Sequence, residues 1–512
     1  MRKIISCCCL MALSALVLTS CYKDLGNYSY HQINQVTIAN FDTINGYIAY
    51  YNDTLTISPT LVSSQNITAD DAYTYEWSYR LSSVQSAAAD SVLATTKTLN
   101  KLITLAPGSY LLMYKVTDKK TGVTFQVKTS MQVSTEIYEG YLVLNDVGGS
   151  ARLDMLSFNK VQSTFTQYTD VLQKQGSTVP MTGQPNQVLC MVYTRSNVVT
   201  QNYGIFLATS TGTNRVNQET FGWDPTYNIR YLTVGDPPQN FTAQHLTGAY
   251  INTNSSNSIY MYAGDGNMYV YSTNAGFAFK YTPLNVYAVA GTPFKTTPWV
   301  ATDGTTAVFY DADNRNFVTA SAPGVATVVP TAPSLNYPTG YDLVWMNCNY
   351  YPEAGQTKTT YAVLKDPVTS KVYLLRFNIG VAQNYFSEIT GTDIANATQF
   401  TVSPDYAYLF YSAGGKVYEY DLALQQSFLM VDKGSAQISY LSCLHIYDRY
   451  GNANYVNWSK LLTVGSYDPA GTPGNNGTLE QYSVQPVNGQ ILLTSQWTGF
   501  GKIVSLAYRA RF

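Results

Sequence analysis

After about residue 138 one pattern recurs along the chain: a strand rich in β-branched and aromatic residues, a turn of Gly, Asn or Asp, and a second such strand. Two copies, at 262–271 and 411–420, align position for position around the second glycine of each turn. A single hairpin cannot bury both of its faces, so hairpins repeated in this way must stack against one another. Looser copies lie at 141–158, 203–221, 305–320, 359–377 and 461–484.

The spacing of these seven hairpins favours a ring. They start about 53 residues apart, and four-stranded propeller blades recur at roughly 40 to 50 residues. Longer loops, such as 222–244 and 469–478, are expected to account for the difference. A ring of stacked blades buries both faces of every hairpin, and the segment 501–508 is expected to add a strand that closes the ring beside the first blade. We therefore predict a β-propeller with seven blades over 136–512; two or three β-sandwiches in series are the alternative.

Composition agrees with an all-β protein. Only 12% of the 512 residues are charged, and the chain contains 45 Tyr, 35 Gly and 20 Pro, which favours short strands and turns over long helices. The net charge is −2 and no basic run follows residue 3, so the chain lacks the cationic surface that nucleic acid requires. We expect no nucleic-acid partner.

Residues 28–135 carry strand-like runs at short spacing, separated by turn residues. Their number and spacing suit one antiparallel, Ig-like β-sandwich. Trp77 stands where such sandwiches place their core tryptophan, so we expect it to be buried. The runs lie at 36–38, 54–57, 73–79, 110–117 and 124–133.

The N-terminus has the layout of a secretory signal. Arg2 and Lys3 precede an apolar stretch, 4–18, that is shorter than the ~20 residues of a membrane-spanning helix. It ends in Leu18-Thr19-Ser20-Cys21, which resembles a bacterial lipobox, where the signal is removed and the Cys is linked to diacylglycerol. We predict a signal peptide at 1–20, lipidation of Cys21 and a tether at 21–27 that holds the chain at a membrane. An ordinary cleaved signal with an incidental Cys21 is the alternative.

Three cysteines follow Cys21 in the mature chain: Cys190, Cys348 and Cys443. An odd number in an exported protein does not suit a disulfide framework. Each lies in an apolar run, so we expect all three to be buried in strands.

Nothing in the sequence marks a catalytic or metal site. His31, His245 and His445 have no partner at metal-ligand spacing, and the motifs HExxH, CxxC and GxSxG are absent. A glycosidase needs only two carboxylates, but no pair stands out by its spacing. Several carboxylates occur where they can accept hydrogen bonds from a turn: Asp118, Asp265, Asp303, Asp313 and Asp366. We predict no catalytic residue, no metal and no cofactor.

Aromatic side chains in loops are the best candidates for ligand contacts. Their flat, rigid faces and polar handles suit stacking on sugar rings or gripping peptide side chains. Packing between blades is the alternative for each of them. The candidates, mostly beside Gly, Pro or Asn, are Trp223, Trp299, Tyr350, Tyr351, Trp458 and Trp497.

The N-terminal part of the chain resembles the PKD-like family lipoproteins of Bacteroidota, specifically over about 18–158. The resemblance rests on the lipobox with the segment 21–34, on Tyr75-Glu76-Trp77, on the strand and turn at 110–122, and on 138–144 leading to 152–155. It implies a PKD-like fold for the sandwich at 28–135. It further implies an outer-membrane lipoprotein, facing the cell surface or the periplasm, of a kind commonly encoded beside starch-utilisation (SusCD-like) transporters. The family has no catalytic residues to carry over.

Three hypotheses for function follow. We favour a non-enzymatic binding or accessory module, lipid-anchored in the outer membrane at the cell surface, that captures a nutrient glycan or peptide for a SusCD-like TonB-dependent importer. The second hypothesis is a propeller glycoside hydrolase or lyase whose carboxylates are not identified. The third is a purely structural accessory subunit of the transporter complex that binds no small ligand.

Overall fold

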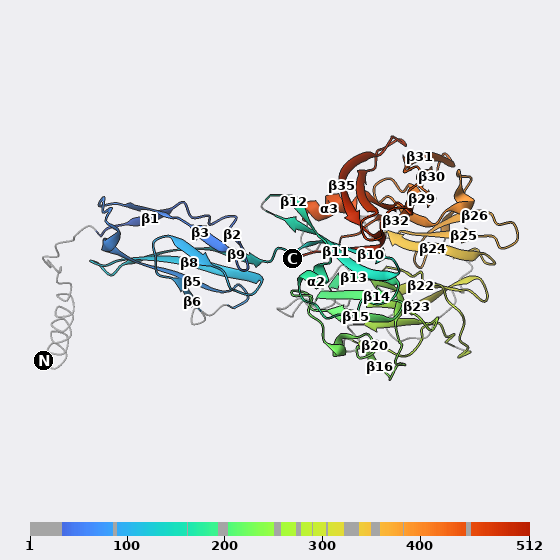
Figure 1. Cartoon of the computed structure of the whole chain (residues 1–512), viewed down its shortest axis with the longest axis horizontal. Helices are drawn as coiled ribbons and strands as arrows, with labels where there is room; N and C mark the ends of the chain where they lie inside the picture. Colours follow the sequence, from blue (N-terminus) through green and yellow to red (C-terminus); the bar gives the residue numbers. More distant parts are fainter. Residues whose placement is uncertain are drawn as a thin grey trace, which may run out of the picture. The chain divides into compact units, whose positions relative to one another are not determined.

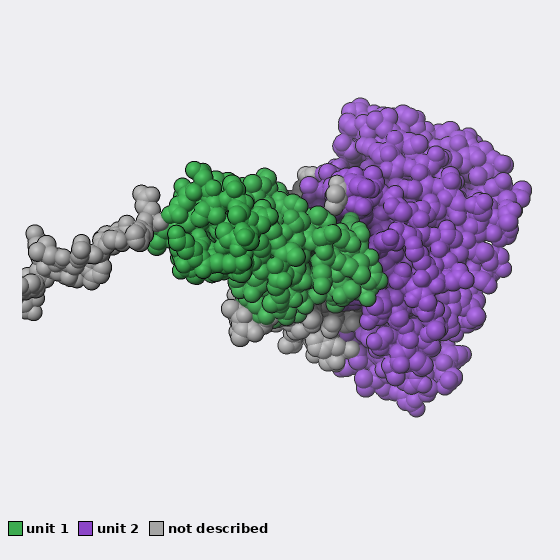
Figure 2. Space-filling model, turned by 60° about the vertical axis from the view of Figure 1, so that its left-hand side comes forward, with its two compact units in different colours: residues 1–134 green, residues 135–512 purple. Residues whose placement is uncertain are grey.

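The chain forms two compact units, Met1–Ser134 (unit 1) and Thr135–Phe512 (unit 2) (Figures 1 and 2). The predicted signal peptide, Cys21 and the tether lie outside the described residues. Among those described, no helix has the length and apolar character needed to cross a membrane. The computed structural model describes residues 33–84, 90–160, 162–192, 203–249, 258–272, 278–288, 290–303, 306–321, 337–349, 359–381, 383–446 and 452–511.

Unit 1 is a β-sandwich in which a five-stranded sheet, β2-β9-β8-β5-β6, shares a core with two strand pairs, β1-β4 and β3-β7. All five predicted runs form strands, namely β1, β3, β5, β8 and β9. The prediction of a wholly antiparallel sandwich is wrong in one place, because β2 runs parallel to β9. The strands are β1 (Val36–Ala39), β2 (Tyr47–Tyr50), β3 (Thr54–Ile57), β4 (Thr60–Ser63), β5 (Tyr73–Leu81), β6 (Ser91–Ala94), β7 (Leu99–Leu102), β8 (Gly108–Asp118) and β9 (Thr124–Ser134).

The core of unit 1 is built around Trp77, as predicted. The Trp77 side chain is fully buried, its Nε1 donates to Thr96 O at 2.8 Å, and its ring stacks on Tyr114 with the centroids 4.2 Å apart. Leu99 of β7 and Leu112 of β8 pack into the same cluster. Because the cluster draws only on residues of unit 1, this unit has a core of its own.

Unit 2 contains seven sheets within its described residues, which we number in chain order. Sheet 1 is β12-β11-β10-β36, sheet 2 is β13-β14-β15, sheet 3 is β16-β20-β19-β18-β17, sheet 4 is β21-β22-β23, sheet 5 is β24-β25-β26-β27, sheet 6 is β28-β29-β30-β31 and sheet 7 is β32-β33-β34-β35.

In sheets 1 to 3 the strands are β10 (Gly140–Val147), β11 (Ser150–Asn159), β12 (Thr164–Tyr168), β36 (Lys502–Arg509), β13 (Pro185–Val192), β14 (Tyr203–Thr209), β15 (Gly212–Val216), β16 (Thr233–Val234), β17 (Ala243–Ala249), β18 (Ser258–Ala263), β19 (Met268–Ser272) and β20 (Ala278–Lys280). In sheets 4 to 7 they are β21 (Ala301–Thr302), β22 (Thr306–Asp311), β23 (Asn316–Ser321), β24 (Asp342–Asn349), β25 (Thr359–Lys365), β26 (Val372–Asn378), β27 (Gln383–Glu388), β28 (Gln399–Val402), β29 (Leu409–Ala413), β30 (Lys416–Asp421), β31 (Gln426–Asp432), β32 (Gln437–Cys443), β33 (Leu461–Tyr467), β34 (Gly477–Ser483) and β35 (Leu492–Phe500).

The seven predicted hairpins are confirmed, and each lies in a different sheet. The two best-matched copies differ in their turns, because residues 264–267 separate β18 from β19, whereas only Gly414 and Gly415 separate β29 from β30. The segment 222–244 is not the plain extended loop that we expected. It holds a short 3-10 helix, η3 (Pro225–Tyr227), and β16, which pairs in parallel with β20.

One aspartate turn recurs at several hairpin ends. The first residue of the turn is Asp, and its Oδ1 accepts hydrogen bonds from the backbone N–H groups two and three residues further along the chain. The fifth residue of the turn has a positive φ. The turn role predicted for Asp118, Asp265, Asp303 and Asp366 is confirmed. Asp313 differs, because its carboxylate accepts from the backbone of Lys295, in an earlier segment. The recurring turns begin at Asp118, Asp311, Asp366 and Asp421.

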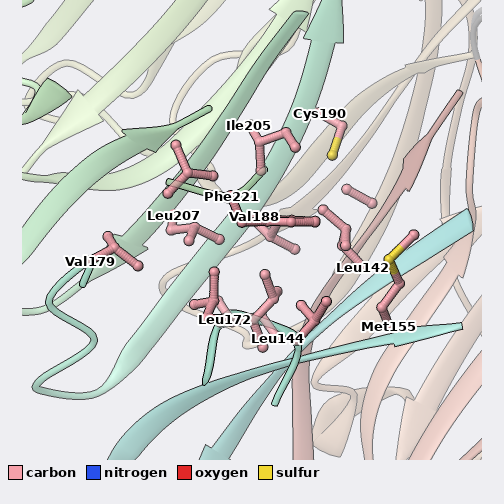
Figure 3. Close-up of a cluster of buried hydrophobic side chains, with 14 of the residues drawn as sticks. Leu142, Leu144, Met155, Leu172, Val179, Val188, Cys190, Ile205, Leu207 and Phe221 are labelled. Atoms are coloured by element: carbon pink, nitrogen blue, oxygen red, sulfur yellow. The ribbon is translucent and has the colours of Figure 1, made fainter. Parts of the chain in front are cut away.

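Apolar clusters join each sheet of unit 2 to the next. In the cluster of Figure 3, Leu142 and Leu144 of sheet 1 meet Val188 and Ile205 of sheet 2. Six further clusters join sheets 2 and 3, 3 and 4, 4 and 5, 5 and 6, 6 and 7, and 7 and 1. Each sheet thus packs on the next through an apolar cluster, which gives unit 2 a propeller-like arrangement.

The C-terminal strand completes sheet 1, as predicted for 501–508. β36 runs antiparallel to β10, and in Figure 1 the C-terminus accordingly lies beside the first strands of unit 2. Leu506 contributes to the cluster shared with sheet 7, and Ala507 to the cluster shared with sheet 2. Beyond the strand, Arg511 forms an ion pair with Glu219 at 2.7 Å. The last strand thus contacts both of its neighbouring sheets.

Candidate functional site

A cavity of about 500 Å³ lies at the centre of unit 2. Six strands, β13, β17, β24, β28, β32 and β36, line it together with Trp299 and Val300, which directly precede β21. Each of these strands and β21 is an edge strand, and each belongs to a different sheet. Six sheets therefore contribute a strand to the wall, and the segment before β21 represents the remaining sheet; we call this space the axial cavity.

Edge strands carry backbone groups that no strand pairs, and side chains of the neighbouring sheets satisfy several of them. Gln187 of β13 donates from Nε2 to Leu246 O of β17 at 2.8 Å and accepts from Leu246 N at 2.5 Å. Thr401 Oγ1 of β28 accepts from Cys443 N of β32 at 3.0 Å. Ser505 Oγ of β36 accepts from Val188 N at 3.2 Å. These polar side chains fasten one inner strand to the next.

Among the described residues, the lining of the axial cavity contains no Asp, Glu, Lys or Arg. Burial holds four of its titratable groups in their neutral forms, because it disfavours a charge. Burial lowers the pKa of His245 to about 4, and it raises the pKa of Cys190, Cys443 and Tyr440 to about 12. These side chains are therefore uncharged at neutral pH.

Three polar side chains in the wall have no hydrogen-bond partner among the described residues. Thr247 of β17, Asn347 of β24 and Gln399 of β28 line the cavity, and none is completely buried. Within the described part of the chain, no residue forms a hydrogen bond with any of these three side chains. Their hydroxyl and amide groups are free to bind water or a ligand.

Aromatic surface borders the same space. Trp299 is half-buried, and its ring meets the ring of His245 edge to face with the centroids 5.2 Å apart. Trp345 of β24 and Tyr440 of β32 also line the cavity, and Trp345 is almost fully buried. The wall thus combines indole and phenol faces with neutral hydrogen-bonding groups.

Of the loop aromatics proposed from the sequence, Trp299 lines the axial cavity. Trp223 packs against the cluster between sheets 1 and 2 and donates from Nε1 to Asn214 Oδ1 at 3.1 Å. Trp458, in the short helix α3 (Ala453–Ser459), and Trp497 of β35 pack against the cluster between sheets 7 and 1. Tyr350 and Tyr351 lie outside the described residues.

Sequence reasoning did not single out Thr247, Asn347 or Gln399. One signal was available, because Asn347 is a polar residue inside the apolar run Val344-Trp345-Met346-Asn347-Cys348 at the start of a repeat. Burial of Cys190, Cys348 and Cys443 is confirmed, and none of the three forms a disulfide with another described residue. They also line the cavity, which nothing in their spacing indicated. In the described residues, no group of three or more His, Cys, Asp and Glu is placed to hold a metal ion.

Comparison with known proteins supports the resemblance seen in the sequence. Residues 21–185 match the profile of the PKD-like family, so the match covers unit 1 from residue 21 onward and continues to the first residue of β13. No curated protein matches the chain.

Several solved structures are distantly similar to this chain. A quinonprotein alcohol dehydrogenase-like protein from Bacteroides thetaiotaomicron VPI-5482 has 12% identity and a TM-score of 0.41, with 94% of this chain and 100% of that chain covered. AztD of Citrobacter koseri has 10% identity and a TM-score of 0.31, covering 85% and 98%. The WD40 domain of SCAP from fission yeast has 12% identity and a TM-score of 0.34, covering 64% and 86%. At these scores the likeness is remote, and the fold assignment rests on the sheets themselves.

Proposed function

We propose that this protein is a non-enzymatic binding module, anchored in the outer membrane through lipid on Cys21, that captures a nutrient for an adjoining SusCD-like TonB-dependent importer. The observation that carries the binding role is the axial cavity, whose described wall residues offer aromatic faces and unpaired neutral polar groups but no carboxylate. A glycosidase needs a pair of carboxylates at the scissile bond, and the described residues of this wall supply none. The apolar stretch 4–18 and the lipobox-like Leu18-Thr19-Ser20-Cys21 support the lipid anchor in this proposal.

We further propose that unit 2 is a seven-bladed β-propeller. Seven sheets in chain order, each with one strand or preceding segment at the axial cavity, support this number of blades. The apolar cluster between sheets 7 and 1 supports closure of the ring. In this proposal the sandwich spaces the ring away from the membrane, and the ring holds the ligand.

Two measurements on the protein from outer-membrane fractions test the proposal. Mass spectrometry of the mature N-terminus is expected to find Cys21 carrying diacylglycerol, and an unmodified Cys21 would contradict the anchor. Thermal unfolding of the detergent-solubilised chain with pools of neutral oligosaccharides and of short peptides is expected to show a raised Tm with one pool, because a ligand that binds only the folded state stabilises it. If neither pool raises the Tm, while a transporter still co-purifies, the protein is a structural subunit instead.

A further inference from the structure

We infer that the axial cavity binds an uncharged, hydroxyl-rich ligand of the carbohydrate class and excludes the charged forms of such molecules. This inference rests on the proposed binding function and adds to it the ligand class, the cavity as the site, and the basis of selectivity.

The polar side chains of the wall divide into two groups. Gln187, Thr401 and Ser505 bind backbone groups of the neighbouring sheets, so their hydrogen bonds are used by the fold. Thr247 and Asn347 have no such partner in the described residues, and neither does Gln399. A hydroxyl and two carboxamides can donate and accept with sugar hydroxyls, which are themselves both donors and acceptors. The second group therefore matches a polyhydroxylated ligand.

The aromatic side chains supply the apolar part of the same recognition. Trp299 is half-buried and reaches the cavity, and Tyr440 lies in the wall on β32. The C–H faces of a sugar ring pack on flat aromatic surfaces, while its hydroxyls remain free for hydrogen bonds. A volume of about 500 Å³ lies within the range of small-ligand sites.

Selectivity follows from the missing charges. No Asp, Glu, Lys or Arg is among the described residues that line the cavity, and His245 is neutral because burial lowers its pKa to about 4. A carboxylate brought into this space loses its hydration and gains no cation, which is costly. A neutral sugar and its uronic acid differ in little except that carboxylate, so the pair isolates this effect.

The first experiment is isothermal titration of the detergent-solubilised full chain with glucose, galactose, mannose and xylose, with glucuronate and galacturonate, and with tetraglycine. We expect at least one neutral sugar to bind, and the matching uronate to bind at least about tenfold more weakly. Equal affinity for the uronate overturns the inference. Binding of tetraglycine without binding of any sugar also overturns the inference but is compatible with the proposed binding function. If none of these compounds binds and no pool raises the Tm, both the inference and the proposed binding function are wrong.

Variants then place the ligand in the cavity. Asn347→Ala and Trp299→Phe are expected to weaken sugar binding, whereas Trp497→Phe, the same change outside the cavity wall, is expected to leave it unchanged. Gln399→Lys is expected to bring a cation into the wall and to raise the affinity for uronate about tenfold or more. Its control is Asn396→Lys, which adds the same charge on the exposed helix η5 (Ile394–Asn396). A Tm close to that of the unchanged protein shows that each variant folds. Unchanged sugar affinity in folded Asn347→Ala and Trp299→Phe places the ligand elsewhere and overturns the inference.

Discussion

Gln187 and Leu246 are joined by two hydrogen bonds across the gap between sheets 2 and 3, with the Gln187 side chain donating to Leu246 O at 2.8 Å and accepting from Leu246 N at 2.5 Å. The side-chain amide thus pairs with one backbone residue as a neighbouring strand would. β17 is an edge strand, and Leu246 is almost fully buried, so water does not readily replace the amide. The pair joins sheets 2 and 3, whose strands do not pair with one another in the described residues.

Replacement of Gln187 is expected to destabilise unit 2. Gln187→Met keeps most of the side-chain volume but leaves the N–H and C=O of Leu246 unpaired, which costs about 2–4 kcal/mol. Chemical denaturation followed by far-ultraviolet circular dichroism measures the change. Gln425→Met, on the exposed turn between β30 and β31, serves as the control, because Gln425 is accessible to water. A loss below about 0.5 kcal/mol in Gln187→Met would show that the pair does not matter.

The hairpins of unit 2 were predictable because their signal is local. Strand alternation and turn residues lie within about 20 residues of one another in each copy, and all seven copies formed hairpins in separate sheets. The core position of Trp77 was predictable for the same reason, since the strand around it, 73–79, alternates in the usual way. Strands β2, β4, β6 and β7 were not predicted; four residues are few to show a period, although the equally short β1 and β3 were predicted.

The candidate site was much less predictable, because it depends on contacts between distant repeats. Gln187 and Leu246 are 59 positions apart, and nothing near Gln187 indicates its partner. Trp223 and Trp299 have similar loop contexts, yet only the structure shows that Trp223 is held by Asn214 and that Trp299 borders the cavity. Thr247 and Gln399 likewise belong to no recognisable motif, and their place in the cavity wall depends on how the sheets of unit 2 are arranged.

Glu419 is expected to make the stability of unit 2 depend on pH. It lies on β30 between Phe410 and Phe428 on the neighbouring strands, and both carboxyl oxygens are buried without a hydrogen-bond partner in the described residues. Burial, with a smaller contribution from Asp421, raises its pKa to about 7 from 4.5. A raised carboxyl pKa means that the native state keeps a proton that the unfolded chain loses. Stability should therefore fall as the pH rises from about 4.5 to 7, by up to about 3 kcal/mol.

The variant Glu419→Gln tests this assignment, because it keeps the shape of the side chain but cannot ionise. Its free energy of unfolding should exceed that of the unchanged protein above pH 7, and the difference should shrink toward pH 4.5. Glu388→Gln, which removes a carboxylate that pairs with Lys371 near the surface, is the control. The same pH dependence in Glu419→Gln and in the unchanged protein would refute the role of Glu419.

The three buried cysteines are expected to resist alkylation in the folded protein. Cys190, Cys348 and Cys443 are buried, and burial raises the pKa of Cys190 and Cys443 to about 12, so little of the reactive thiolate is present at pH 8. Iodoacetamide should label them only after unfolding, whereas an added surface thiol in Ser435→Cys should react at once. The count after unfolding also tests the anchor: a thioether-linked Cys21 leaves three reactive thiols in the mature chain, and four would contradict lipidation.

Removal of the C-terminal strand is expected to open the ring while unit 1 stays folded. A chain that ends at Gly501 lacks β36, which exposes the edge of β10 and takes Ile503, Leu506 and Tyr508 from the cluster between sheets 7 and 1. Unit 1 keeps its own core around Trp77, so it has no need of β36. Limited proteolysis with mass spectrometry should therefore show a resistant fragment that covers 33–134. The rest of the truncated chain should be digested rapidly. In Lys502→Ala, which leaves the backbone pairing of β36 intact, unit 2 should resist digestion as it does in the unchanged protein. Equal resistance of unit 2 in the truncated and intact chains would show that the last strand does not hold the ring together.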